Sequence, residues 1–252
     1  SLPGVANTVD LQGGRLDGAA HAMLDGPGNT AVTIGNAPQL VGSIALGAGS
    51  DRLSLTGSNI DQVPTVDGGD DADVADGFID RLSLSGMTGT QPAAKFVNWE
   101  QIALSNGTEL TFTGSAISTG TGQVAGEPMG LLVNSGTTLQ FDAADFTVQG
   151  DLTQAGSVSL INANPNGSLT VSGDYSGGGW LSLDTVFRDS SSLSDRLIVQ
   201  GTARGGPTLL NLNNLGPGAA TSGNGILLVE VQGLSPAGAF ALPAPGYRDV
   251  NG

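Results

Sequence analysis

Apolar and polar residues alternate in short runs from one end of the chain to the other. Such alternation is typical of β-strands that have one buried face. No window of about a dozen residues keeps apolar residues at helical spacing without an interrupting Gly, Pro or β-branched cluster. The pattern therefore predicts an all-β protein with many short strands, which include residues 52–55, 81–84, 109–112, 138–141, 168–171 and 196–199.

Several of these strands belong to repeated motifs. Residues 51–57 (DRLSLTG) return as 80–86 (DRLSLSG) and, more loosely, as 195–201 (DRLIVQG). A second motif places an Asn/Gly turn before an alternating strand, and it occurs at residues 106–112, 134–141 and 166–171. Corresponding positions lie about 28–30 residues apart, which is within the range of solenoid coils.

Stacking of equivalent strands predicts a right-handed parallel β-helix, also called a β-solenoid. The Asn and Gly residues of the motifs lie where the chain must turn and adopt a positive φ. A β-sandwich, or a pair of them, has strands at similar spacing and is the competing architecture. Internal repetition favours the solenoid, in which five leucines would face inward: Leu53, Leu82, Leu110, Leu139 and Leu169.

Two stretches depart from the repeat. Residues 61–77 are acidic and contain Pro and Gly, which predicts a loop that leaves the wall of the helix. From about Gly167 the strands become longer and more apolar, and this predicts a C-terminal cap that covers the last coil. The chain is therefore expected to divide into a β-helical segment, residues 1–165, and a C-terminal region, residues 166–252.

The composition indicates a narrow core and argues against nucleic acid as a partner. The chain has 41 glycines in 252 residues and only 4% aromatic residues, so its core must be narrow and built from small apolar side chains. Its 23 acidic residues outnumber 8 basic ones, for a net charge of −15. Nucleic-acid binding needs a basic surface and is therefore not expected. With no cysteine, disulfides and Cys-ligated zinc are absent.

The C-terminal region resembles a known family. Residues 167–185 (GSLTVSGDYSGGGWLSLDT) resemble the C-terminal passenger region of bacterial autotransporters, which is called the autochaperone or the pertactin-like passenger end. The resemblance continues in four further blocks and extends weakly to an upstream coil: 194–203, 218–221, 225–229, 239–242 and 96–104. It implies a right-handed β-helix, export through the outer membrane, and a C-terminal β-barrel that anchors or releases the passenger. The chain would then be a fragment that ends before that barrel.

The function that the resemblance implies is structural or adhesive, at the bacterial cell surface or outside the cell. The chain would be a passenger segment and not an enzyme, and its C-terminal part would promote passenger folding during export. Expected partners are a host surface or matrix ligand, other copies on neighbouring cells, and the protein's own C-terminal β-barrel.

The sequence contains few of the residues that catalytic sites use. His21 is the only histidine, and no Gly-Asp-Ser-Gly-like segment accompanies it, so a Ser-His-Asp site is not expected. A β-helix that cleaves polysaccharide with paired carboxylates is the alternative function. Lys95 is the only lysine and Trp99 and Trp180 are the only tryptophans, so the groups for a sugar-stacking cleft are scarce.

Calcium is the metal that the sequence suggests, and a Ca²⁺-stabilised repeat module is a further alternative. Residues 47–53 (GAGSDRL) fit the core of a calcium-binding nonapeptide repeat, although no second turn follows. Asp51, Asp80 and Asp195, each followed by Arg, are expected to cap turns or pair locally. A solvated surface is the simpler interpretation of the acidic loop, whose hard oxygen ligands are Asp67, Asp70, Asp71, Asp73 and Asp76.

Overall fold

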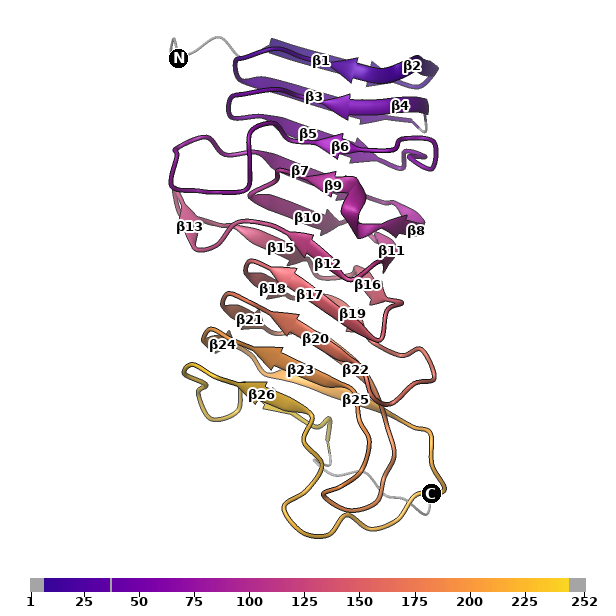
Figure 1. Cartoon of the computed structure of the whole chain (residues 1–252), viewed down its shortest axis with the longest axis vertical. Helices are drawn as coiled ribbons and strands as arrows, with labels where there is room; N and C mark the ends of the chain where they lie inside the picture. Colours follow the sequence, from indigo (N-terminus) through magenta and orange to yellow (C-terminus); the bar gives the residue numbers. More distant parts are fainter. Residues whose placement is uncertain (1–6, 37, 245–252) are drawn as a thin grey trace.

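The computed structural model describes residues 7–36 and 38–244. Residues 1–6, 37 and 245–252, which include the outer ends of both predicted segments, lie outside the described residues. The described chain winds into coils of parallel strands that stack along one long axis (Figure 1). The prediction of a parallel β-helix is confirmed, because strands from successive coils pair in parallel and an antiparallel sandwich is excluded.

The longest wall of the helix is a nine-stranded parallel sheet. Its strands, in spatial order, are β1 (Asn7–Gln12), β3 (Thr30–Gly35), β5 (Arg52–Thr56), β7 (Arg81–Ser85), β10 (Gln101–Ser105), β15 (Gly130–Val133), β18 (Leu152–Gln154), β21 (Tyr175–Gly177) and β24 (Ala203–Gly205). The second wall is a seven-stranded parallel sheet. It consists of β8 (Thr88–Pro92), β11 (Glu109–Thr113), β16 (Thr138–Phe141), β19 (Ser157–Ser159), β22 (Trp180–Thr185), β25 (Thr208–Asn214) and β27 (Phe240–Ala241).

The third wall contains two sheets that follow one another along the axis (Figure 1). The N-terminal sheet contains β2 (Arg15–Leu24), β4 (Gln39–Ala45), β6 (Val66–Asp67) and β9 (Phe96–Val97). The C-terminal sheet contains β12 (Ala116–Ser118), β17 (Asp145–Gln149), β20 (Ser168–Val171), β23 (Arg196–Val199) and β26 (Val229–Val231). A 3₁₀ turn, η1 (Ala93–Lys95), precedes β9. Within the described residues no helix is long and apolar enough to cross a membrane.

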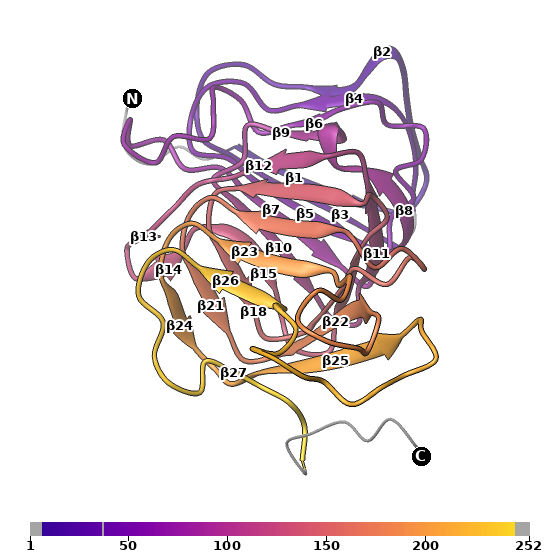
Figure 2. The same ribbon diagram turned by 60° about the horizontal axis from the view of Figure 1, so that its bottom comes forward.

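From β7 onward each coil supplies one strand to each wall, and Figure 2 shows the walls wrapping around a common interior. Coil length varies: Arg52 and Arg81 are in register and 29 residues apart, whereas Arg81 and Gln101 are in register and only 20 apart. Parallel β-crossovers are almost always right-handed, so the right-handed winding stays the expectation for these coils. A constant period near 29 residues therefore describes only some of the coils.

The closest sequence repeats lie on adjacent coils, and the looser ones do not. Leu53 pairs with Leu82 in the nine-stranded sheet, and Leu110 pairs with Leu139 in the seven-stranded sheet. The third members of both motifs, β20 and β23, instead pair with each other in the third wall. The expectation that all members of a motif stack on one another is therefore wrong for β20 and β23. The reason is that a short alternating strand can pack into any of the three walls.

The acidic loop predicted for residues 61–77 begins later than residue 61. Val63 and Val66 are both buried, and Val66 starts β6, so the chain leaves the wall only after Asp67. Near the C-terminus, the apolar run Gly225–Val231 forms a strand only at β26, which is paired with β23. Regular coils thus extend through β26, and the chain then returns to place β27 beside β25.

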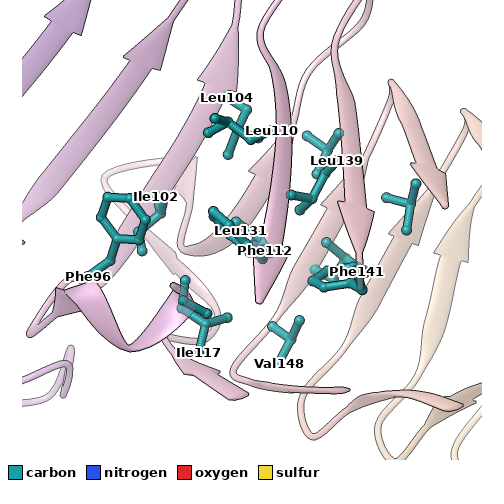
Figure 3. Close-up of a cluster of buried hydrophobic side chains, with 14 of the residues drawn as sticks. Phe96, Ile102, Leu104, Leu110, Phe112, Ile117, Leu131, Leu139, Phe141 and Val148 are labelled. Atoms are coloured by element: carbon teal, nitrogen blue, oxygen red, sulfur yellow. The ribbon is translucent and has the colours of Figure 1, made fainter. Parts of the chain in front are cut away.

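The five leucines predicted to face inward are all buried, each no more than 2% exposed. Rings from successive coils also contact one another along the axis (Figure 3). Ring centroids are 5.7 Å apart for Phe96–Phe112, 6.4 Å for Phe112–Phe141 and 4.3 Å for Phe141–Phe146. The first two pairs join neighbouring coils and the third joins β16 to β17 of one coil, all at spacings typical of favourable aromatic pairs.

Turns between walls use the residues that the motifs predicted. Asn106 and Gly107 adopt φ of 52° and 74°, and Gly136 adopts 76°, which confirms the positive φ expected at two of the Asn/Gly turns. Elsewhere glycine permits close approach between coils. A Cβ at Gly179 would lie 1.8 Å from the carbonyl oxygen of Gly156, so a larger residue there would force neighbouring coils apart.

Truncation of one inward leucine tests this packing. Leu139 lies between Leu110 and Val158 of the neighbouring coils, so Leu139→Ala should lower the free energy of unfolding by about 3 kcal/mol. The control is Thr138→Ala on the half-exposed face of the same strand, which should cost less than about 1 kcal/mol. Urea denaturation followed by circular dichroism measures both, and equal losses would contradict the assigned facing.

Candidate functional site: carboxylates at the coil corners

The acidic loop, residues 68–79, is held largely by its own carboxylates. At its start, Asp67 Oδ1 accepts hydrogen bonds from Gly69 N at 3.1 Å and Asn98 Nδ2 at 2.9 Å. Three later aspartates each accept the backbone N–H two residues on, at 2.6–2.9 Å: Asp71 from Asp73, Asp73 from Ala75, and Asp76 from Phe78. These Asx turns point the carboxylates back at the loop backbone.

The structure does not gather the five predicted calcium ligands at one point. Within the described residues, no group of three or more His, Asp or Glu side chains is placed to hold a metal ion. Burial and, to a smaller extent, the charge of Asp70 raise the pKa of a different set of acids, Asp51, Asp80 and Glu100. At Gly69 the loop also lies against Asp80, a buried carboxyl group at a corner of the helix.

Asp51, Asp80 and Glu100 form a line that we name the carboxyl column. They precede β5, β7 and β10 and are 0%, 0% and 1% exposed. Asp51 Oδ1 accepts the N–H of Thr30 at 2.6 Å, Asp80 Oδ1 that of Asp51 at 2.6 Å, and Glu100 Oε2 that of Asp80 at 2.5 Å. Each acid thus caps the corner of the coil before it, as expected for Asp51 and Asp80.

The column is unusual because its buried carboxyl groups have few hydrogen-bond donors to stabilise a negative charge. Burial raises the pKa of Asp51 to about 6, that of Asp80 to about 8 and that of Glu100 to about 7. Asp51 Oδ2 and Asp80 Oδ2 are buried without a hydrogen-bond partner. Buried polar atoms are nearly always paired, so these two oxygens mark an unusual site.

A second pair of buried carboxylates joins coils in the C-terminal region. Asp195 accepts the N–H of Gly167 at 2.9 Å and that of Asp184 at 2.8 Å. Asp184 accepts the N–H groups of Asn162 and Ala163 at 2.9 and 2.7 Å, and Asn213 Nδ2 donates to it at 2.6 Å. The pair therefore connects three successive coils, and Asp195 caps a turn as predicted.

Tyr175 also connects these coils, on another side of the helix. Its ring is 1% exposed, and its hydroxyl lies 2.9 Å from Gln154 Oε1 and 2.8 Å from Thr208 Oγ1. The ring of Phe240 stacks on Tyr175 with centroids 5.5 Å apart. Residues from β18 to β27 are thus tied together by one buried side chain.

An open groove of about 370 Å³ lies beside the β-hairpin of β13 (Gln123–Val124) and β14 (Glu127–Pro128). Asp151 and Asp174 line it. Asp151 accepts the N–H groups of Gly122 and Asp174, both at 2.7 Å. Asp174 accepts the N–H of Thr202 at 2.8 Å and lies 3.0 Å from Arg204. All four carboxylate oxygens of this pair are therefore engaged within the protein.

The residues considered for catalysis lie apart from this groove. His21 is exposed on β2, in agreement with the predicted surface position. Lys95 is buried, and its ammonium group donates to the carbonyl of Ile60 at 2.7 Å. Trp99 is buried and donates to the carbonyl of Val66 at 2.9 Å, whereas Trp180 is 43% exposed.

The sequence analysis missed Glu100 and Asp184 as site residues. The signal for Glu100 was an acid directly before a strand, the position that Asp51 and Asp80 also occupy. Asp184 is buried near the end of β22, on the face opposite to Leu181 and Leu183, and nothing in the sequence marks it. Its role depends on neighbours 11 to 29 residues away.

Comparison with known proteins gives the class to which this stacked architecture belongs. Residues 132–247 match the family described as Autochaperone Domain Type 1, which here begins inside β15 and contains complete three-walled coils. A probable autotransporter of Escherichia coli K12, YfaL, is 32% identical over 208 residues, covering 73% of this chain and 17% of the relative. The adhesin BmaC autotransporter of Brucella suis biovar 1 is 31% identical over 218 residues, covering 82% of this chain and 6% of that protein.

A third relative, the uncharacterized protein YuaQ of Escherichia coli K12, is 39% identical over 87 residues, which is 34% of this chain and 6% of that protein. The chain thus spans only a small part of these relatives. No solved structure matches it. The chain is an autotransporter passenger region that carries an autochaperone domain of type 1.

Calcium binding by the acidic loop stays a prediction. A Ca²⁺ ion would have to replace the backbone N–H groups that donate to Asp71, Asp73 and Asp76. At a free Ca²⁺ concentration ten times the dissociation constant, binding would add about 1.4 kcal/mol to the free energy of unfolding. Millimolar Ca²⁺ should then raise the melting temperature, and Asp73→Asn should reduce that rise. Identical melting curves with calcium and with a chelator would contradict the hypothesis.

Proposed function

We propose that this passenger region is an extracellular structural and adhesive module, exported through the outer membrane to the cell surface, without enzymatic activity of its own. The C-terminal coils promote the folding of the coils that precede them. The match to an autochaperone domain and the similarity to a relative named as an adhesin support the two halves of this proposal.

The observation that carries the folding role is the buried polar network of the C-terminal coils. Asp184 and Asp195 satisfy backbone and side-chain donors from three coils, and Tyr175 links β18 to β25. A solenoid is a nearly one-dimensional stack, so the coils with the most interactions between neighbours fold first and supply an edge for the next coil. During export such a segment would act as a template.

An adhesive role suits the outer surface of the walls. Polar residues such as Thr111, Gln140 and Thr170 alternate with the buried leucines and phenylalanines, so the walls present rows of hydrogen-bonding groups. The expected ligands are a host surface or matrix component, or a second copy on a neighbouring cell, and the passenger would also act with its own translocator domain. Net charge of −15 separates the module from other anionic surfaces.

Polysaccharide cleavage is the weaker alternative. It needs one carboxylate free to donate a proton and another free to act as base or nucleophile. Asp151 and Asp174, the acids of the groove, each have both oxygens engaged by backbone N–H groups or Arg204. This arrangement favours a structural role for the pair.

Limited proteolysis in rising urea tests the folding role. We expect a resistant core within residues 167–242 to outlast the N-terminal coils, because that region contains the network described above. Asp195→Ala leaves the N–H groups of Gly167 and Asp184 unpaired, so it should abolish this resistance, whereas Asp142→Ala on the exposed surface should not. Survival of an N-terminal fragment after residues 167–242 are digested would refute the proposed role.

Adhesion is tested with the folded chain on beads. Beads coated with it should bind a panel of extracellular-matrix proteins, or clump with one another, more strongly than beads coated with the same chain after denaturation. When the folded chain is incubated with polysaccharide substrates, no reducing sugar should appear in the solution. Absence of both binding and clumping would remove the adhesive half, and sugar release would favour the enzymatic alternative.

A further inference from the structure

The carboxyl column of Asp51, Asp80 and Glu100 has no role in folding of the C-terminal coils or in adhesion as argued above. We propose that it is a proton-binding site, which holds protons at neutral pH and destabilises the coils around it when it loses them. The ligand is the proton itself. The acidic loop at residues 68–79 covers the column and opens when the protons are lost.

The first argument is the absence of compensating charge in the part of the chain that the structure describes. The charged side chains that act on the column are all acids: Asp25 acts on Asp51, Asp70 acts on all three members, and Asp76 acts on Glu100. The ion pairs of the described residues do not include a column member.

The arginines next to the column point elsewhere. Arg52 and Arg81 follow Asp51 and Asp80 directly, and alternation along the strand places their side chains on the outer face. Arg52 is exposed, and Arg81 Nε lies 3.1 Å from Glu127 Oε2 of the hairpin. Three buried carboxylates without a cation cannot all remain ionised at low cost, because burial of unpaired charge is strongly unfavourable.

The second argument is the shape of the group. Its members stand on successive coils, about 4.8 Å apart in the strand-pairing direction, so they form a line and not a shell around one point. One proton on each carboxyl can neutralise a line, and each proton needs only one oxygen. Asp51 Oδ2 and Asp80 Oδ2, the buried oxygens without a donor, are the positions where those protons belong.

The cover lies against Asp80 Oδ2. An ideal Cβ at Gly69 would be 3.4 Å from Asp80 Oδ2, and one at Gly120, in the coil after Glu100, would be 2.9 Å from Val74 of the loop. The loop therefore excludes water from the column while contributing Asp70, whose charge opposes ionisation. Once the column ionises, repulsion from Asp70 and the demand for hydration both favour opening of the cover.

The direction of the pH dependence follows from the raised pKa values of about 6, 8 and 7 for Asp51, Asp80 and Glu100. In the unfolded chain these carboxyls have ordinary pKa values near 4. A folded state that binds protons more tightly is most stable at low pH, and this stabilisation is lost as the pH rises toward about 8. The chain should therefore be more stable in mild acid than in mild base.

Thermal melting at pH 5 and pH 8 tests the site. The wild-type melting temperature should fall by roughly 5–10 °C between these values. Asp80→Asn retains an oxygen that can accept the N–H of Asp51 and carries no charge, so it should remove at least half of that fall and melt higher than wild type at pH 8. The exposed control Asp142→Asn should melt like wild type at both values.

A second measurement needs no variant. Unfolding the wild-type chain with urea in weakly buffered solution at pH 7 should release about one to two protons per molecule, since the unfolded carboxyls are ionised there. Release of no protons, or a wild-type melting temperature that is equal at pH 5 and pH 8, would overturn the proposal. It would also fail if millimolar Ca²⁺ at pH 8 raised the melting temperature of wild type but not of Asp80→Asn, because a cation would then neutralise the column.

Discussion

Backbone hydrogen bonding at the corners of the coils is the constraint on which the rest of this structure depends. Within the walls, parallel strands satisfy one another, but the corners leave N–H groups that need other acceptors, several of which an adjacent coil supplies. In this chain aspartate and glutamate side chains accept many of them, as Asp80 does for Asp51 and Asp195 for Gly167. Stacking therefore depends on acids that are buried because the corners themselves are buried.

The two halves of the molecule use these acids differently. Asp184 and Asp195 accept donors at both oxygens, so their charge is spread over several N–H groups and Asn213. Asp51 and Asp80 accept one donor each and leave the second oxygen unpaired. The first arrangement gives every carboxylate oxygen a donor, whereas the second leaves one oxygen of each acid free for a proton.

This difference fits a passenger that folds from one end. The C-terminal coils are complete on all three walls and are connected by Tyr175, Asp184 and Asp195. The first coils have strands on two walls only, and the carboxyl column with its loop lies between β3 and β10. The buried carboxyl groups with an unpaired oxygen thus lie in the N-terminal coils, and the C-terminal pair has both oxygens of each acid paired.

The sequence by itself determined the all-β class, the parallel stacking of the closest repeats and the inward leucines, because alternation and repetition are local properties. It also indicated that Asp51, Asp80 and Asp195, each followed by Arg, cap turns or pair locally, and the structure shows the first of these two roles. The tertiary structure alone decided which wall each strand joins, so that β20 and β23 left their motif partners. It likewise decided that Val63 and Val66 belong to the core and that Glu100 and Asp184 matter. The physical reason is that coil length varies with the loops at each corner, so the neighbours of a residue one coil away cannot be counted along the chain.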